Sequence, residues 1–480
     1  MAKFYVTTPI YYVNDRPHIG HTYTTIAADV LARYWRGRGE QVLFSVGLDE
    51  NAQKTVNAAA TQNQDIKTYT ETMAKVWQST WDKLGITYDR FVRTTSTAHQ
   101  QAVYAFFEPV QARGDIYRGT YEGLYCVGHE AFLKPEDLVD GKCPEHGKPP
   151  EPFKEENYFF KLSAYAKPLL EHIKANPEFV QPKTRRNEVV AFITRGLEDI
   201  SISRATQKWG IPFPGDSNQV VYVWFDALIN YLTATGYPAA DFAKWWPADV
   251  HLVGKDIIKF HCIIWPAMLL SAGLELPKSI FAHGFFTVEG QKVSKSLGNA
   301  IDPLAIAAEF GNDTLRYYLL KEIPFGGDGE FNHQRLAAVY TSDLANDLGN
   351  LVQRTAKMVK QYQQGVVGTL GQGAHDVAAY HEAVAKLELD KALAEVWSMV
   401  HGLNQYVDEE KPWLLAKQND DEHLGEVLDY LVGNILQVGK LLEPFLPETA
   451  AKIAQTFADG TVHTEVGILF PKKERTKAES

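Results

Sequence analysis

The sequence has few cysteines and no long apolar run, and each absence argues against a class of protein. Its 480 residues include only three cysteines, which argues against the disulfide framework of a secreted protein and favours a reducing compartment. The longest apolar stretch follows Phe260, ends at Leu274 and is too short to span a bilayer. The N-terminus lacks the apolar core and cleavage site of a signal peptide. We therefore expect a soluble cytoplasmic protein.

An excess of positive charge is also absent. Lys and Arg number 48 against 59 Asp and Glu, which gives a net charge of −11. This balance argues against general coating of nucleic acid but leaves room for a local basic site. The composition, 45% apolar and 12% aromatic, is that of a folded chain. The length predicts about three domains.

Strand and helix signals alternate in two parts of the chain, which predicts a parallel α/β sheet. In such a sheet, ligands bind beyond the carboxyl ends of the strands. Helical spacing occurs at Ala27, Val30, Leu31 and Tyr34 and at about residues 65–84. The expected strands are residues 3–8, closed by Pro9, and residues 41–47, 219–224, 251–254 and 279–283.

The pattern between and after these parts is different. Short strands and turns fill residues 114–204, and apolar residues at helical spacing dominate from about Gly329. One predicted helix face consists of Leu428, Leu431, Ile435, Val438 and Leu442. The predicted architecture is a Rossmann-type parallel sheet split by a small, zinc-knuckle-like insertion and followed by an all-α bundle. The predicted boundaries are 1–113 and 218–328 for the two halves of the α/β domain, 114–217 for the insertion and 329–475 for the bundle.

Two short motifs carry candidate chemistry. His18-Ile19-Gly20-His21 follows the first strand and opens a helix, where the imidazoles can donate to phosphoryl oxygens. The alternative is a surface loop with two solvated histidines. Far along the chain, Lys292 and Lys295, with Ser294 and Ser296, suit a mobile phosphate clamp. Alone, this second motif is more often a solvated basic turn.

Together the motifs resemble those of the class I aminoacyl-tRNA synthetases, and within that class the bacterial methionyl-tRNA synthetases. One departure is Val293, where the family usually has Met. The matching stretches cover nearly the whole chain and are residues 5–14, 47–50, 222–228, 253–257, 260–268 and 411–415.

The resemblance implies that the chain activates methionine with ATP, in the presence of Mg²⁺, to methionyl-adenylate and pyrophosphate. Methionine then passes to the terminal adenosine of methionine tRNA, for initiation and elongation of translation. It implies that the catalytic residues are His18, His21, Lys292 and Lys295. The implied ATP-binding residues are His18, Gly20, His21, Gly254, Lys255, Asp256, Lys295 and Ser296. For Lys255 and Asp256 the alternative is a helix-capping pair.

The resemblance also implies a methionine pocket. Asp49, at the end of a strand, would bind the ammonium group, and its alternative role is a helix N-cap. His261 would donate to the thioether sulfur or pack beside it. Without the resemblance, the aromatic residues would be ordinary core. The implied walls are Ile10, Tyr12, Val223, Trp224, Ala227, Tyr231, Ile257 and His261.

A candidate metal site lies in the insertion. Cys126 and His129 form one C-x₂-H pair and Cys143 and His146 form a second, which suits tetrahedral zinc in a structural role. Bacterial relatives often use three cysteines and one histidine here, and His129 stands at one of those cysteine positions. The alternative is a decayed knuckle without metal.

The resemblance gives the helical domain the role of reading the anticodon. Asn350 and Arg354 lie four apart on one predicted helix face, where they can bond to exposed base edges. Trp413 can stack on a base, although packing between helices is its alternative role. Arg354, Lys357 and Lys360 form a local basic stripe.

Three rival functions have evidence against them. Some other class I synthetases of this fold carry a larger editing domain. Others have a catalytic zinc at the amino-acid site, but this sequence has no cysteine near Asp49 or Trp224. A non-catalytic tRNA-binding paralogue does not need the intact histidines and lysines. A nucleotidyltransferase without a tRNA partner does not need the helical domain. We expect a monomer, because the chain has no room for a C-terminal dimerisation domain.

Overall fold

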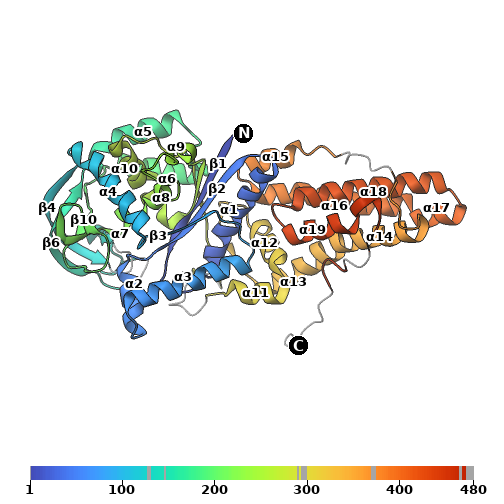
Figure 1. Cartoon of the computed structure of the whole chain (residues 1–480), viewed down its shortest axis with the longest axis horizontal. Helices are drawn as coiled ribbons and strands as arrows, with labels where there is room; N and C mark the ends of the chain where they lie inside the picture. Colours follow the sequence, from blue (N-terminus) through green and yellow to red (C-terminus); the bar gives the residue numbers. More distant parts are fainter. Residues whose placement is uncertain are drawn as a thin grey trace. The chain divides into compact units, whose positions relative to one another are not determined.

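The computed structural model describes residues 2–126, 131–133, 135–144, 147–288, 291–292, 300–368, 375–463 and 467–471. The chain forms two compact units, Met1–Gly284 and Phe285–Ser480 (Figure 1). Among the described residues, no helix is long and apolar enough to cross a membrane. The predicted domain boundaries stay predictions.

The N-terminal unit is built on a six-stranded sheet with the order β3-β2-β1-β12-β13-β7. Every neighbouring pair in it is parallel, which confirms the predicted α/β sheet. Its strands are β1 (Lys3–Tyr12), β2 (Gln41–Asp49), β3 (Arg90–Arg93), β7 (Val180–Gln181), β12 (Val250–Gly254) and β13 (Ile280–His283).

The strand order reverses between β1 and β12. On one side the chain runs from β1 to β2 and β3, and on the other from β12 to β13. In open parallel sheets, such a reversal opens a crevice at the carboxyl ends of the two strands, and ligands bind there. The helices of the first half are α1 (Ile19–Gly37), α2 (Gln53–Thr61), α3 (Ile66–Lys83) and α4 (Thr97–Ala112).

The carboxyl edge of the sheet is shaped by two residues. β1 continues through Pro9 to Tyr12, with a shift in register between Thr7 and Ile10, so the expected strand end at Pro9 is wrong. Proline cannot donate to a ladder, and the irregularity accommodates it. A side chain at Gly47 would place its Cβ 2.4 Å from the Val92 carbonyl oxygen. Glycine therefore allows β2 to approach its neighbours closely.

The middle of the chain forms two antiparallel sheets. The four-stranded one has the order β5-β4-β6-β8, and the three-stranded one β10-β11-β9. Their strands are β4 (Ile116–Cys126), β5 (Ala131–Leu133), β6 (Glu151–Phe160), β8 (Ile200–Ser201), β9 (Ser203–Arg204), β10 (Pro212–Phe213) and β11 (Asp216–Val221). The helices α5 (Ala166–Ala175) and α6 (Lys183–Thr194) lie between β6 and β8 in the chain.

The strand expected at residues 219–224 is wrong in two respects. β11 is antiparallel and ends at Val221, and α7 (Val223–Ala227) begins two residues later. A short apolar run does not distinguish a strand from a buried helix. The remaining helices of this unit are α8 (Asn230–Thr233), α9 (Phe242–Trp245) and α10 (Trp265–Ala272).

The C-terminal unit is largely helical, as predicted. It begins with the three-stranded sheet of β14 (Phe286–Val288), β15 (Gln291–Lys292) and β16 (Gly329–Glu330). The helices are α11 (Pro303–Phe310), α12 (Asn312–Lys321), α13 (His333–Val339), α14 (Asn350–Tyr362), α15 (Ala378–Ala385), α16 (Leu389–Glu410), α17 (Pro412–Gln418), α18 (Asp421–Leu442) and α19 (Pro447–Thr456). The predicted apolar face of α18 is buried throughout, at Leu428, Leu431, Ile435, Val438 and Leu442.

Candidate active site

His18 and His21 form the N-terminal cap of α1, directly after β1. The backbone N–H of Gly20 donates to Nδ1 of His18 (3.1 Å), and that of His18 donates to Nδ1 of His21 (3.3 Å). A neutral imidazole that accepts at Nδ1 carries its proton at Nε2. The cap therefore gives both rings an Nε2–H donor at the carboxyl edge of the sheet.

The two rings stack on each other, with centroids 3.7 Å apart. Tyr11 and Trp77 pack against His21, with centroid distances of 4.7 and 5.0 Å. Desolvation, together with the neighbouring His18, lowers the pKa of His21 well below its ordinary value. A Cβ at Gly20 would lie only 3.0 Å from the His18 ring. The glycine of the motif therefore leaves space for that ring.

Other predicted site residues lie at the same edge of the sheet. Asp49 is the last residue of β2 and is almost fully buried. Gly254 ends β12, and Lys255 and Asp256 follow it in a short 3₁₀ turn. The structure thus brings the strand ends carrying the predicted ATP-binding and methionine-binding residues to the crevice between β1 and its neighbours.

The predicted methionine walls include a hydrogen-bonded pair. His261 Nδ1 lies 3.0 Å from the Ile257 carbonyl oxygen, which only accepts, and His261 Nε2 lies 2.6 Å from the Tyr231 hydroxyl. Burial lowers the pKa of His261 to about 4, so the ring is neutral and Nε2 accepts from Tyr231. In this arrangement His261 has no N–H left for a thioether sulfur. Of its two expected roles, only packing fits the geometry.

Trp224 lies at the start of α7 and stacks on Phe260, with ring centroids 3.7 Å apart. The Trp224 indole N–H is buried and has no hydrogen-bond partner among the described residues. Phe260 lies in residues 260–268, which match the family, but the sequence predicts no role for it in the site. The remaining predicted wall residues are buried or half-buried and are Ile10, Tyr12, Val223, Ala227 and Ile257.

Sequence reasoning missed a set of buried polar residues that neighbour the predicted methionine-binding residues in sequence. Asp226 accepts hydrogen bonds from Asn51 and His99, and all three side chains are buried. Glu50 pairs with Arg93 at 2.9 Å, and burial raises the pKa of Glu50. Glu50 and Asp226 lie in residues 47–50 and 222–228, which match the family, and both are charged residues in largely apolar sequence. A search for such residues could have found them.

Some predicted residues lie outside the described residues. These are Lys295 and Ser296 of the second motif, and His129 and His146 of the candidate zinc site. Lys292 ends β15, and Cys126 ends β4. Cys126 and Cys143 are buried, and Cys143 has the hydrogen bonds of a tight turn, to Gly147 and Lys148. No group of three metal-ligating side chains occurs among the residues that the structure describes.

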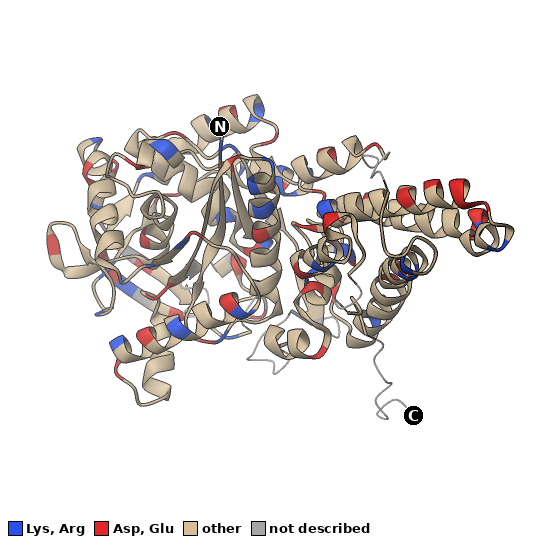
Figure 2. Ribbon diagram, turned by 45° about the vertical axis from the view of Figure 1, so that its right-hand side comes forward, with Lys and Arg blue, Asp and Glu red and all other residues tan. Residues whose placement is uncertain are grey.

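The predicted anticodon residues lie on the helical unit. The guanidinium carbon of Arg354, on α14, is 5.9 Å from the Trp413 ring centroid, and Asn350, one turn before Arg354, is exposed. Arg354 also lies 3.3 Å from Asp408. Figure 2 shows acidic residues gathered where α16 ends and α18 begins. The structure therefore places Arg354 beside Trp413, in partly acidic surroundings.

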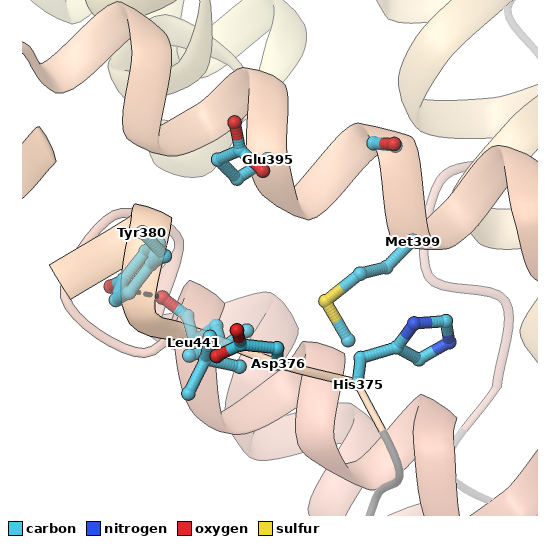
Figure 3. Close-up of a pocket in the computed structure, with 8 residues that line it drawn as sticks. His375, Asp376, Tyr380, Glu395, Met399 and Leu441 are labelled. Atoms are coloured by element: carbon cyan, nitrogen blue, oxygen red, sulfur yellow. Dashed lines mark hydrogen bonds between the residues drawn. The ribbon is translucent and has the colours of Figure 1, made fainter. Parts of the chain in front are cut away.

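A small pocket elsewhere in the helical unit contains no predicted site residue. Its walls come from α15, α16, α18 and the segment before α15 (Figure 3), and the Tyr380 hydroxyl donates to the Leu441 carbonyl there. The lining residues are His375, Asp376, Val377, Tyr380, Glu395, Ser398, Met399 and Leu441. Neither Arg354 nor Trp413 is among its lining residues.

Comparisons with known proteins agree with this geometry. The family model described as class I tRNA synthetases (M) matches residues 4–149 and 134–356, and the model of the anticodon-binding domain of methionyl tRNA ligase matches residues 367–466. Methionine–tRNA ligases of Caldanaerobacter subterraneus and Thermotoga maritima are 46% and 45% identical to this chain. Each match covers 94% of this chain, and 73% and 74% of those relatives.

Solved structures give the same result. The methionyl-tRNA synthetase of Mycobacterium tuberculosis in complex with methionyl-adenylate is 39% identical, with a TM-score of 0.93, over 98% of this chain and 100% of that one. Its apo form is 37% identical, with a TM-score of 0.87, over 99% of each chain. The fold and site define a class I tRNA synthetase. Within that class, the chain belongs to the methionine–tRNA ligases.

Desolvated histidines predict acid sensitivity of the N-terminal unit. Burial lowers the pKa of His21, His251 and His283, and that of His261 from 6.5 to about 4. Below pH 6.5 the unfolded chain binds protons at these rings and the native chain does not, so stability is kept above pH 6.5 and falls below it. For His261 alone we expect a loss of about 1.4 kcal/mol per pH unit until about pH 4.

Urea denaturation between pH 4 and 8 measures this slope. The variant His261→Gln should have a shallower slope than the unmodified protein. An unchanged slope in His261→Gln would contradict the assignment.

Proposed function

We propose that the cap of α1 is the phosphate-binding centre of methionine activation. The methionine carboxylate attacks the α-phosphorus of ATP, an oxygen–phosphorus bond forms, and the bond to the leaving pyrophosphate breaks. The observation that carries this proposal is that His18 and His21 both use Nδ1 to accept backbone N–H groups. Their Nε2–H groups then donate to phosphoryl oxygens as charge develops on them.

The neutrality of His21 suits this role. Because its pKa lies well below the ordinary value, the ring stays neutral at neutral pH. Its Nε2–H therefore remains a donor of fixed orientation. Gly20, Gly254, Lys255, Asp256 and Ser296 complete the ATP site. Lys292 and Lys295 stabilise the leaving pyrophosphate. Mg²⁺ bound to ATP neutralises phosphate charge.

In the methionine pocket, Asp49 accepts the ammonium group. The thioether packs against the aromatic wall, where Tyr231 is held by His261 and sulfur–aromatic contacts are worth about 0.3–1.5 kcal/mol each. The Trp224 indole N–H is a buried donor on this wall that has no hydrogen-bond partner among the described residues. Pocket shape alone discriminates side chains only about 10- to 200-fold, so a polar contact adds to specificity.

In the second step, a hydroxyl of the terminal adenosine of methionine tRNA attacks the adenylate carbonyl, and AMP leaves. Asn350, Arg354 and Trp413 read the anticodon by hydrogen bonding and stacking. The support is the contact between Arg354 and Trp413 on the helical unit. The predicted monomeric state, the cytoplasmic location and the domain boundaries stay predictions.

The catalytic proposal is tested by His18→Asn and His21→Asn. Asparagine keeps an acceptor near the Nδ1 position and so keeps the cap, but it removes the Nε2–H donor. We expect kcat for methionine-dependent ATP–pyrophosphate exchange to fall about 10²- to 10³-fold. His172→Asn, on α5, is the control and should leave kcat unchanged. A normal kcat in both cap variants, or exchange driven by another of the twenty amino acids, would overturn the proposal.

The anticodon proposal is tested by Trp413→Ala. Loss of one stacked base costs about 1–3 kcal/mol, so aminoacylation should fall about ten- to hundredfold while ATP–pyrophosphate exchange stays intact. Leu414→Ala, at the exposed neighbouring position on α17, should change neither activity. Equal loss of both activities in Trp413→Ala would contradict an anticodon role.

We also propose a structural zinc held by Cys126, His129, Cys143 and His146. Two observations support it: both thiols are buried, and the Cys143 carbonyl accepts from the Gly147 N–H at 2.8 Å, as in a tight knuckle. Purified protein should contain about one zinc per chain by elemental analysis. Cys143→Ser should lose the metal and some thermal stability, and Cys262→Ser should keep the metal. Well under one zinc in the chelator-washed unmodified protein would refute the site.

A further inference from the structure

A series of buried hydrogen bonds joins four segments of the N-terminal unit. The Asn51 side-chain amide donates to Asp226 Oδ2 at 2.6 Å, and His99 Nε2 lies 2.6 Å from Asp226 Oδ1. The Thr233 hydroxyl lies 2.8 Å from His99 Nδ1. Since a carboxylate only accepts, His99 donates through Nε2. The loop after β2 is thereby tied to α4, α7 and α8, which are labelled in Figure 1.

These polar side chains are buried at positions where apolar side chains could also fill the space. The side chains of Asp226 and His99 are both 0% exposed, and Asn51 is 4% exposed. Burying a carboxylate is costly even when it is paired, and apolar residues of similar volume often stabilise a protein more. The polar set is therefore a costly way to hold α4 against α7 and α8. Its directional bonds, however, fix the relative positions of these segments.

Both ends of this hydrogen-bond network reach predicted methionine-binding residues. At one end, the Asn51 backbone N–H donates to Asp49 Oδ1 at 3.3 Å. At the other, Asp226 directly precedes Ala227, and Thr233 lies two residues after Tyr231. One network thus extends from the anion expected to bind the ammonium group to the wall expected to enclose the thioether.

We propose that Asn51, Asp226 and His99 are positioning residues that set the spacing between Asp49 and the Ala227–Tyr231 wall, and thereby the affinity for methionine. They touch no substrate atom. The proposal rests on the proposed function, in which Asp49 binds the ammonium group. A displaced Asp49 weakens methionine binding in the ground state and in the transition state alike, which raises KM and leaves kcat nearly unchanged.

The first test is Asp226→Asn. The asparagine keeps the volume but has one acceptor atom, so its amide opposes either the Asn51 amide or the His99 N–H. We expect KM for methionine to rise about tenfold, the scale of losing a hydrogen bond to a charged group. KM for ATP and kcat of exchange should change less than about twofold.

The matched control is Asp115→Asn. Asp115 is also a buried carboxylate of this unit, and it accepts from the Tyr165 and Ser271 hydroxyls. None of these three residues is predicted to bind substrate. Asp115→Asn should lower the melting temperature as Asp226→Asn does, but leave KM for methionine unchanged. A similar rise of KM in both variants would show a general loss of stability and would overturn the proposal.

The second test exchanges the two partners. In the double variant Asn51→Asp and Asp226→Asn, the amide N–H at position 226 donates to the carboxylate at position 51. The amide oxygen at position 226 still accepts from His99. Only the 3.3 Å bond from Asn51 to the Thr94 carbonyl is lost. KM for methionine should return most of the way to its original value, whereas Asn51→Asp alone should raise it further than Asp226→Asn. A double variant no better than the single ones would contradict the network.

Asp49→Asn separates the two proposals. If it leaves KM for methionine unchanged, the ammonium site itself is wrong. If it raises KM while Asp226→Asn behaves like Asp115→Asn, the ammonium site stands and the positioning network is wrong. If Asp226→Asn does not fold, Asn51→Ala takes its place as the test, because it leaves the pair of Asp226 and His99 intact. The same rise in KM for methionine is expected.

Discussion

The candidate active site depends on the parallel pairing of β1 with both β2 and β12. β1 pairs with residues distant in sequence on one side and with the following strand on the other. Because all these strands run in the same direction, their carboxyl ends meet at one edge, and the reversal of order opens a crevice there. This arrangement places the α1 cap, Asp49 and Gly254 at the same edge of the sheet. Gly47 helps to maintain it, since a Cβ there would meet the Val92 carbonyl.

Around that crevice, histidines act through fixed tautomers. His18 and His21 accept hydrogen bonds from backbone N–H groups at Nδ1. His261, in contrast, donates from Nδ1 to the Ile257 carbonyl oxygen and accepts from the Tyr231 hydroxyl at Nε2. In each case the partner of one ring nitrogen decides what the other can do. Desolvation keeps His21 and His261 neutral, so their donors and acceptors do not exchange roles near neutral pH. The same ring chemistry thus supports the proposed phosphate binding in one place and holds the Tyr231 side chain in another.

Much of the fold and part of the candidate site could be predicted from the sequence, because local patterns encode them. Residues 3–8 are rich in residues that favour strands, residues 41–47 are largely apolar, and the predicted face of α18 follows helical spacing. β7, in contrast, is two residues long and depends on its pairing with β13. His18 and His21 are three apart, so their spacing is visible. Asp226 bonds to residues 175 and 127 positions away, and no local pattern encodes such a pair.

The net charge of −11 limits how tRNA can be bound. Affinity that came mainly from phosphate contacts would need an extended basic surface. Acidic residues instead gather where α16 ends and α18 begins, and Arg354 itself lies 3.3 Å from Asp408 (Figure 2). At such a surface, favourable binding energy has to come from contacts that read particular bases, because phosphate attraction is locally weak. In the proposed function, hydrogen bonds from Arg354 would read base edges, and stacking on Trp413 would add affinity that does not depend on phosphate charge. The acidic surroundings thus favour selectivity over general affinity for nucleic acid.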